Sequence, residues 1–257
     1  EKEASSKAKR FPRRPVKEIG CWGGYPRVNE ASAGYLLEKD GFHLLLDCGS
    51  GVLSLLPNYL PVEQLDAVIL THYHADHIAD IGVLQHALLI QSYITEVKTP
   101  LPIYGHPFAE EAFKQLTYKD ITTGIGYDPT KPLEIGPFTI HFLETNHSVP
   151  CFALRIEADG KSLVYTGDSA YTDAFIDFVR DADLLLSECN FYDGMDGSTA
   201  GHMNSKDAAT IAAKGNVKQL VLTHLPHFGD VEKLPQEAKK YFSGPVHLAK
   251  KGQVWNI

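Results

Sequence analysis

The chain has 257 residues, of which 44% are hydrophobic and 22% are charged. This composition is typical of a folded globular protein and is too apolar for an intrinsically disordered one. Its apolar stretches are much shorter than the roughly 20 residues that cross a bilayer, so we expect no membrane association. The four cysteines form no CxxC pair, and the N-terminus shows no apolar secretion segment. We therefore expect reduced thiols and a cytoplasmic location.

Charge is distributed unevenly along the chain. Residues 1–18 carry seven Lys or Arg and three acidic side chains, whereas the remainder carries 17 basic and 29 acidic side chains, a net charge of −12. We expect residues 1–15 to form a basic, flexible arm and residues 16–257 to form a single domain. An acidic domain does not attract long polyanions through its overall charge.

Hydrophobic alternation and turn residues predict a series of strands and helices from residue 16 onward. The first strand begins near Val16 and leads into a glycine turn at 20–24. Further strands are predicted over 33–37, 42–47, 67–70, 103–104, 138–144, 152–157, 161–166, 184–187 and 219–223, and helices from about 52 and over 78–92, 110–116, 175–180 and 205–214. Residues 124–132 are predicted to form an irregular loop near the functional site. Strands near both ends with helices between them favour an α/β sandwich of two mixed sheets with helices outside.

The strongest motif is His72-Tyr73-His74-Ala75-Asp76-His77, which directly follows the apolar strand at 67–70. Residues i and i+2 of an extended loop point the same way, so His72 and His74 can bind one metal ion. The chain then turns into a helix, so that Asp76 and His77 face a second ion. Imidazole and carboxylate ligands without a thiolate suit two Zn²⁺ ions, with Mn²⁺ or Fe²⁺ possible.

Three more metal-competent side chains follow apolar strands. His147 comes after the strand at 138–144, Asp168 after the strand at 161–166, and His224 after the strand at 219–223. Because open α/β sheets form sites at the carboxyl ends of their strands, we expect these side chains to converge on the motif.

This pattern resembles the metallo-β-lactamase superfamily, which has a four-layer αββα sandwich and five ordered motifs that here span almost the whole chain. Asp47 matches the first motif, a buried acidic residue that braces the site. The resemblance implies that one zinc ion is held by His72, His74 and His147, and the other by Asp76, His77 and His224. It also implies that Asp168 bridges the two ions.

A second resemblance concerns Glu188 and the segment that begins Gly201-His202. Both are similar to the ribonuclease Z branch of the superfamily, which implies that His202 contacts the scissile phosphate and that Glu188 orients it. The chain departs from that branch in one respect. His147 and Asp168 are only 21 residues apart, which leaves no room for the long arm that grips tRNA. We therefore expect a phosphodiesterase acting on a small or cyclic phosphodiester or a short RNA.

The expected reaction is hydrolysis, in which two metal ions lower the pKa of a water between them and supply hydroxide at neutral pH. Asp76 would orient this nucleophile, and His202 would stabilise the transition state or protonate the leaving oxygen. Three alternatives stay open: tRNA 3′ processing, hydrolysis of a thioester or lactone as in glyoxalase II relatives, and nucleic-acid binding with a vestigial site. Dimers are common in the resembled branch, so a homodimer is possible.

Overall fold

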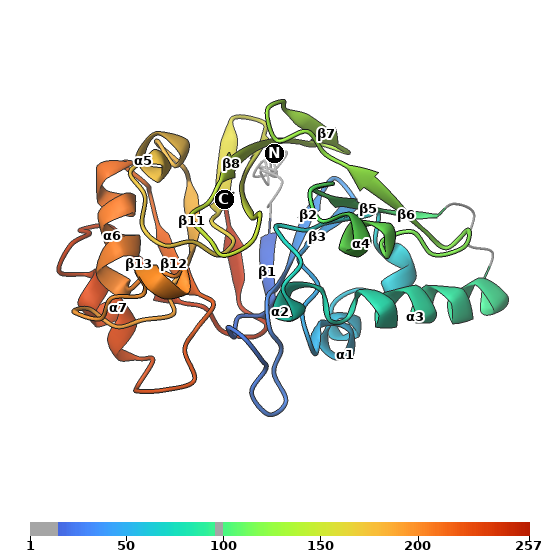
Figure 1. Cartoon of the computed structure of the whole chain (residues 1–257), viewed down its shortest axis with the longest axis horizontal. Helices are drawn as coiled ribbons and strands as arrows, with labels where there is room; N and C mark the ends of the chain where they lie inside the picture. The colour runs from blue at the N-terminus through green and yellow to red at the C-terminus, as the bar shows by residue number, and fades with distance from the viewer. Residues whose placement is uncertain (1–14, 96–99) are drawn as a thin grey trace, which may run out of the picture.

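The computed structural model describes residues 15–95 and 100–257, and it folds them into two sheets packed face to face with helices on both outer sides (Figure 1). The layers are helix, sheet, sheet and helix, which confirms the predicted αββα sandwich. The arm predicted for residues 1–15 lies, except for Pro15, outside the described residues. None of the helices in the described ranges is long and apolar enough to cross a membrane.

The first sheet has seven strands in the described part of the chain. In spatial order they are β14 (Val254–Asn256), β1 (Pro15–Gly20), β2 (Gly34–Lys39), β3 (Phe42–Leu46), β4 (Ala67–Ile69), β5 (Leu101–Gly105) and β6 (Thr122–Gly126). Pairing is antiparallel from β14 to β3 and parallel from β3 to β6. Along β3, Leu44 and Leu46 point toward the second sheet and Leu45 toward the outer helices, which is the two-residue period of a strand.

The second sheet also has seven strands among the described residues. They are, in spatial order, β13 (Val246–Leu248), β12 (Leu220–Thr223), β11 (Leu184–Glu188), β10 (Lys161–Tyr165), β9 (Phe152–Ala158), β8 (Phe138–Glu144) and β7 (Leu133–Ile135). Pairing is parallel from β13 to β10 and antiparallel from β10 to β7. Strands β9 and β10 form a hairpin whose turn is Asp159-Gly160, so the short link between His147 and Asp168 is a compact hairpin.

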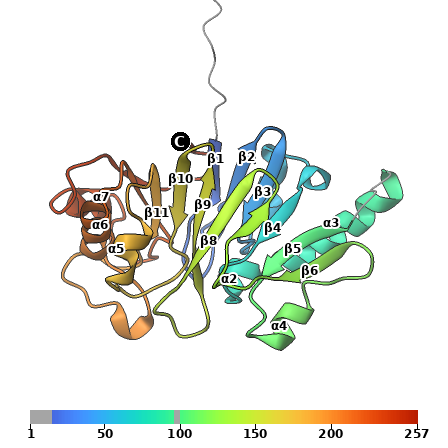
Figure 2. The same cartoon turned by 90° about the horizontal axis from the view of Figure 1, so that it is seen from above.

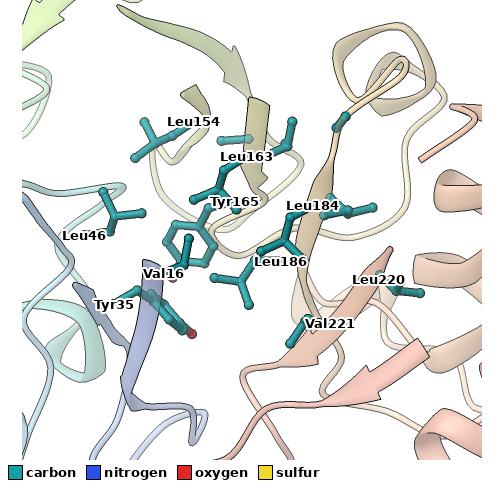
Figure 3. Packing of buried hydrophobic residues seen from close by; sticks show 14 of the residues in the cluster. Val16, Tyr35, Leu46, Leu154, Leu163, Tyr165, Leu184, Leu186, Leu220 and Val221 are labelled. Atoms are coloured by element: carbon teal, nitrogen blue, oxygen red, sulfur yellow. The ribbon is translucent and has the colours of Figure 1, made fainter. Parts of the chain in front are cut away.

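The main hydrophobic core lies between the two sheets (Figure 3). Tyr35 and Leu46 of the first sheet meet Leu163, Tyr165 and Leu186 of the second, and all five side chains are buried. The rings of Tyr35 and Tyr165 lie 4.9 Å apart, within the range for favourable aromatic pairs. Packing across this layer fixes the two sheets relative to each other and so fixes the edge at which their strands end.

Helices cover the outer face of each sheet (Figures 1 and 2). The helical segments are α1 (Val52–Leu55), η1 (Leu56–Asn58), η2 (Val62–Gln64), α2 (Ala75–Ile78), α3 (Ile81–Ile94), α4 (Glu110–Lys114), α5 (Ala174–Phe178), η3 (Ser198–Ala200), α6 (Ser205–Lys214) and α7 (Lys233–Ala238). Helices α1 and α3 lie against the first sheet, and α5, α6 and α7 lie against the second. Helix α6 begins with a capping box in which Asn204 and Asp207 exchange hydrogen bonds, a pattern that defines its first turn.

Most predicted elements are present within a few residues of their expected bounds, and the helix predicted over 205–214 coincides with α6. One prediction was wrong, because residues 124–126 belong to strand β6 and not to an irregular loop. This strand lies at the edge of its sheet and contains two glycines, so it shows no hydrophobic alternation. Strands β7, β13 and β14 were not predicted, since each has only three residues and, unlike the apolar β4, contains a polar one.

A buried carboxyl group lies on β1. Glu18 is 0% exposed, and its Oε2 accepts a hydrogen bond from the backbone N–H of Lys250 at 2.6 Å. Burial raises the pKa of Glu18 from its ordinary value of 4.5 to about 8, although the indole of Trp255 and the Lys250 N–H partly offset this. Between these two pH values the folded chain holds a proton that the unfolded chain lacks. This contribution to stability is therefore lost as the pH rises through the window.

We expect Glu18→Gln to weaken this dependence, because a neutral side chain of the same shape needs no proton. The melting temperature of the variant should fall less between pH 6 and pH 9 than that of the unsubstituted protein. At pH 9 its free energy of unfolding should exceed that of the unsubstituted protein by an amount on the order of a few kcal/mol. Thermal unfolding at both pH values measures this. The exposed Glu38 on β2 provides a matched control, Glu38→Gln. Equal pH dependence in all three proteins would show that Glu18 does not titrate in this window.

Candidate metal centre

Strand direction brings the candidate residues to one edge of the sandwich. Strands β3 and β4 are parallel, as are β10, β11 and β12, and β8 runs the same way as β10 because both pair antiparallel with β9. At or just beyond the carboxyl ends of these strands stand Asp47 (β3), His72 (β4), His147 (β8), Asp168 (β10), Glu188 (β11) and His224 (β12). The carboxyl ends of strands are where α/β proteins most often place their sites.

The first cluster comprises His72, His74, His147 and Asp168, whose candidate ligand atoms all lie within 4.8 Å of one another. Nδ1 of His74 lies 3.2 Å from Nε2 of His72 and 3.0 Å from Nε2 of His147. Oδ2 of Asp168 lies 3.6 Å from Nε2 of His72 and 3.7 Å from Nε2 of His147. The structure thus brings together the residues that the sequence assigned to one ion.

The second cluster comprises Asp76, His77, Asp168 and His224, also within 4.8 Å of one another. Oδ2 of Asp76 lies 3.0 Å from Nε2 of His224 and 3.5 Å from Nε2 of His77. The two oxygens of Asp168 lie 3.3 Å from Nε2 of His77 and 3.3 Å from Nε2 of His224. Asp168 is therefore shared by both clusters, the position expected of a bridging carboxylate.

The geometry of both clusters fits tetrahedral metal ions. Bonds of about 2.0–2.1 Å to a tetrahedral Zn²⁺ place neighbouring ligand atoms about 3.3–3.4 Å apart, and the pair distances given above run from 3.0 to 3.7 Å within clusters that span at most 4.8 Å. In the described residues, Nε2 of His77 and Oδ1 of Asp168 are buried without a hydrogen-bond partner. A cation bound between them would satisfy both atoms, which otherwise carry a desolvation cost. Zn²⁺, Mn²⁺ and Fe²⁺ all accept this donor set.

The electrostatics of the clusters also favour a cation. Burial holds the pKa of His72 well below its usual range, so its ring is neutral and offers a lone pair. Burial would raise the pKa of Asp168, but the imidazoles of His224 and His77 hold it well below its ordinary value. Burial would likewise lower the pKa of His77, but the carboxylates of Asp168 and Asp47 raise it well above its usual range. The carboxylates thus attract positive charge here, and a divalent ion can replace those protons.

A buried network around Asp47 orients two of the imidazoles. Oδ2 of Asp47 accepts hydrogen bonds from Nδ1 of His77 at 2.7 Å, from the hydroxyl of Thr71 at 2.9 Å and from the hydroxyl of Tyr165 at 2.9 Å. The Thr71 hydroxyl lies 3.0 Å from Nδ1 of His72 and can accept its proton. Each ring therefore carries its proton on Nδ1 and presents Nε2 to the cluster, which is how supporting residues orient metal ligands.

Backbone conformation adds to this support. Asp47 and His224 have φ values of +54° and +50°, a region that costs a non-glycine residue about 1–2 kcal/mol. Gly201 has φ +75°, and its carbonyl accepts a hydrogen bond from Nδ1 of His147 at 3.0 Å. A Cβ on Gly201 would lie 2.7 Å from that same nitrogen, so this close approach requires glycine.

Glu188 and His202 form a pair beside the second cluster. Glu188 is 0% exposed, and its Oε1 accepts hydrogen bonds from Nδ1 of His202 at 2.8 Å and from the backbone N–H of Ser169 at 3.0 Å. The ring of His202 stacks on that of His224 with centroids 5.1 Å apart. Burial would lower the pKa of His202, but the Glu188 carboxylate raises it to about 9. The Glu188 carboxylate thus favours the protonated form of His202 and holds its Nδ1.

Comparison with known proteins places the chain in a family. Residues 43–225 match the family described as "Beta-lactamase superfamily domain". The chain belongs to the metallo-β-lactamase superfamily. The "Probable metallo-hydrolase YhfI" of Bacillus subtilis is 55% identical over 240 residues, which cover 93% of this chain and 98% of that protein. The crystal structure of YhfI superposes with a TM-score of 0.94 at 53% identity, covering 95% of this chain and 100% of that one.

More distant relatives indicate the branch of the superfamily. A ribonuclease Z of Metallosphaera sedula is 26% identical over 275 residues, covering 87% of this chain and 92% of that protein. The crystal structure of the short form of human tRNase Z superposes with a TM-score of 0.74 at 22% identity and shares the fold over 94% of this chain and 98% of that chain. The chain is thus similar in sequence to a ribonuclease Z and shares its fold with a tRNase Z.

Several residues that complete this superfamily site were not singled out from the sequence. Thr71 and Tyr165 hydrogen-bond to Asp47, and the backbone N–H of Gly24 donates to Oδ2 of Asp76 at 2.8 Å. The adjacent Gly23 packs so closely that a Cβ there would lie 2.7 Å from the His224 ring. Thr71 directly precedes the histidine motif and could have been suspected. The glycine turn was noticed, but nothing local shows that it reaches a residue more than 50 positions away.

The ligand assignment predicts how metal content responds to substitution. We expect His74→Ala to lower the bound metal from about two ions per chain to about one, since it removes one of three imidazoles from the first cluster only. Elemental analysis after dialysis measures the stoichiometry. The exposed His86 on α3 provides a control, and His86→Ala should retain the full content. Two tightly held ions in the His74 variant would remove His74 from the ligand set.

Proposed function

We propose that this chain is a dinuclear metal-dependent hydrolase, and specifically a phosphodiesterase that acts on a small or cyclic phosphodiester or a short RNA. The observation that carries this proposal is the Glu188–His202 pair, which holds a cationic imidazole next to two metal-competent clusters. The name of YhfI as a probable metallo-hydrolase and the ribonuclease Z relatives support the same chemistry.

The residues divide the reaction between them. When bound, the two ions would activate a water molecule and neutralise charge on the substrate. Oδ2 of Asp76 is held by the backbone N–H of Gly24 and lies at the second cluster, where it can orient the attacking water. Nε2 of His202 can donate to a phosphate oxygen or to the leaving oxygen, because Glu188 fixes the proton on Nδ1 and keeps the ring charged.

The charge of His202 favours a phosphodiester over a thioester or lactone. Hydrolysis of an acyl substrate develops one oxyanion, which the metal ions themselves can stabilise. A phosphodiester already carries a negative charge and gains more at its non-bridging and leaving oxygens. The protonated His202 ring, held 2.8 Å from the buried Glu188 carboxylate, adds a positive charge beside the two ions. This charge stabilises the transition state of phosphodiester hydrolysis more than that of acyl hydrolysis. Thioester or lactone hydrolysis of the glyoxalase II type remains the alternative outside phosphate chemistry.

The compact β9–β10 hairpin favours a small substrate. It occupies the whole interval between Phe152 and Tyr165, so this interval contributes no arm that could reach the body of a folded tRNA. Residues 19–257 also carry a net charge of −12, so the overall charge does not attract a long polyanion. Processing of the tRNA 3′ end is therefore the alternative within phosphodiester chemistry.

Hydrolysis of bis-p-nitrophenyl phosphate by the metal-loaded protein tests the reaction class. We expect turnover of this diester, and we expect His202→Ala to lower kcat by about 10²- to 10⁴-fold with unchanged metal content, because the variant loses the proton donor but no ligand. A thioester and a lactone are assayed in parallel. Turnover of only these acyl substrates would replace the phosphodiesterase assignment with the glyoxalase-like one, and an unaltered rate in the variant would remove His202 from the mechanism.

We also propose that the chain forms a homodimer through α3, which lies at the outer side of the molecule (Figure 2). The helix contains no Asp, Glu, Lys or Arg, although one of its faces is turned to solvent. That face exposes Val83, Ile90, Tyr93 and Ile94, at 52%, 56%, 80% and 70%. Large apolar side chains gathered on the exposed face of one helix often mark an interaction surface. An uncharged apolar face is also complementary to itself, as a twofold interface requires.

Placing charge on this face should break the dimer. We expect the unsubstituted protein to have twice the mass of one chain in light scattering after gel filtration, and the double variant Ile90→Glu, Tyr93→Glu to be monomeric, because two carboxylates would be buried at the interface. Val254→Glu, which charges an exposed apolar residue on β14, is the control and should stay dimeric. A monomeric unsubstituted protein would contradict the proposal.

A further inference from the structure

The loop that follows β1 is attached to the second cluster at several points. The backbone N–H of Gly24 donates to Oδ2 of Asp76 at 2.8 Å, and the N–H of Gly23 donates to the carbonyl of Leu225 at 3.1 Å. Leu225 in turn donates to the carbonyl of Cys21 at 2.8 Å. Two segments far apart in the sequence, 21–25 and 224–227, are therefore joined directly beside the candidate ligands. In Figure 1 the first of them begins the dark blue loop below α2.

Tyr25 stands at the end of this attachment, one residue beyond the Gly24 contact. Its ring lies parallel to that of His227, with centroids 3.6 Å apart and an angle of 5° between the planes. His227 is itself held, because its Nε2 lies 3.1 Å from the carbonyl of Gly23 and 2.7 Å from the carbonyl of Tyr25. Tyr25 is nevertheless 60% exposed. One face of its ring is covered by a fixed imidazole, so the exposure belongs to the other face and the edge.

Tyr25 lies near the second cluster, because it directly follows Gly24, whose N–H donates to Asp76. The His224 ring is contacted from two segments: His202 stacks on it at 5.1 Å, and a Cβ on Gly23, two residues before Tyr25, would lie 2.7 Å from it. Phe228, next to His227 in the sequence, is 44% exposed, and its ring centroid lies 6.1 Å from that of Phe191. The Phe191 ring in turn lies 6.5 Å from the His202 ring. Exposed apolar rings near a functional site are unfavourably hydrated, so a flat ligand that covers them gains free energy from the buried apolar area.

We propose that Tyr25, backed by His227, stacks on the nucleobase of a nucleoside phosphodiester and so determines a preference for substrates that carry a base. The inference rests on the proposed phosphodiesterase function and specifies its substrate class. Stacking on an aromatic side chain tolerates any base, since every base has a flat π-face.

A second exposed aromatic residue, Phe108, is the alternative ring on which a nucleobase could stack. Phe108 is 59% exposed and packs against Phe152 at 5.8 Å and His106 at 5.7 Å, on the side of the site formed by the end of β5. Among the described residues, no neighbour of Phe108 in the sequence donates a hydrogen bond to a candidate ligand, as Gly24 beside Tyr25 does to Asp76. The Tyr25 position is favoured because both its ring and its backbone are fixed relative to the second cluster.

The test compares two five-membered cyclic phosphates, adenosine 2′,3′-cyclic monophosphate and glycerol 1,2-cyclic phosphate, which differ in whether they carry a nucleoside. The quantity measured is the ratio of their kcat/KM values for the metal-loaded protein. We expect the ratio to favour the nucleotide and to fall about 10- to 100-fold in Tyr25→Ala, chiefly through a higher KM. Tyr25→Phe, which keeps the ring, and Phe108→Ala, on the other rim, should both retain the ratio.

Other outcomes overturn the inference in distinguishable ways. If Tyr25→Ala lowers kcat/KM equally for both substrates, Tyr25 only supports the structure of the site. If Phe108→Ala lowers the ratio and Tyr25→Ala does not, the base binds at the opposite rim. If the protein hydrolyses bis-p-nitrophenyl phosphate without preferring the nucleotide, the nucleobase site is wrong while the phosphodiesterase function stands. Failure with all three diesters would refute the proposed function and the inference together.

Discussion

The carboxylate of Asp47 is the constraint on which the site depends. It lies at the end of β3 with a left-handed φ of +54° and is 0% exposed. Its two oxygens accept hydrogen bonds from the Thr71 backbone and hydroxyl, from His77 and from Tyr165 of the second sheet. A buried carboxylate without these donors would be strongly destabilising, so the group, its donors and the packing of the two sheets are mutually dependent. Asp47 thereby connects the sandwich core with the tautomers of two candidate ligands.

The two sheets also hold the candidate metal ligands together. Each sheet has a parallel and an antiparallel half, and the strand ends that carry candidate ligands or their support, those of β3, β4, β8, β10, β11 and β12, face the same edge. No short segment of the chain could gather five imidazoles and two carboxylates this closely, because like groups would repel one another and all would lose hydration. The fold holds them at 3.0–3.7 Å spacing because each is fixed by its own strand end or by the α2 turn. Part of the free energy of folding therefore maintains a cluster that is unfavourable until a cation binds.

The sequence predicted the parts of this arrangement that local chemistry determines. The histidine motif, the strands that precede His147, Asp168 and His224, and the helix α6 all carry local patterns, and the structure places them as expected. What could not be predicted depends on contacts between distant positions. The Tyr165 hydrogen bond to Asp47 spans 118 residues, and the Gly24 contact with Asp76 spans 52. Strand β6 was missed because its residues show no alternation, and its place is determined by pairing with β5 along the whole of Leu101–Gly105.

An acidic chain can still bind an anionic substrate, because the substrate responds mainly to the electrostatic potential inside the site and less to the net charge of the chain. An overall charge of −8 acts across the solvent and is screened within about 8–10 Å at physiological salt. Inside the site the charges are different: the Glu188 carboxylate favours the protonated form of His202, and two divalent ions would outweigh Asp76 and Asp168. A small diester that enters the site meets this positive charge at short range, where screening is weak. A long polyanion would have to lie across the acidic surface as well, so its size would count against it. Under the proposed function, the net charge would therefore favour short diesters over long polyanions, as the short β9–β10 hairpin also does.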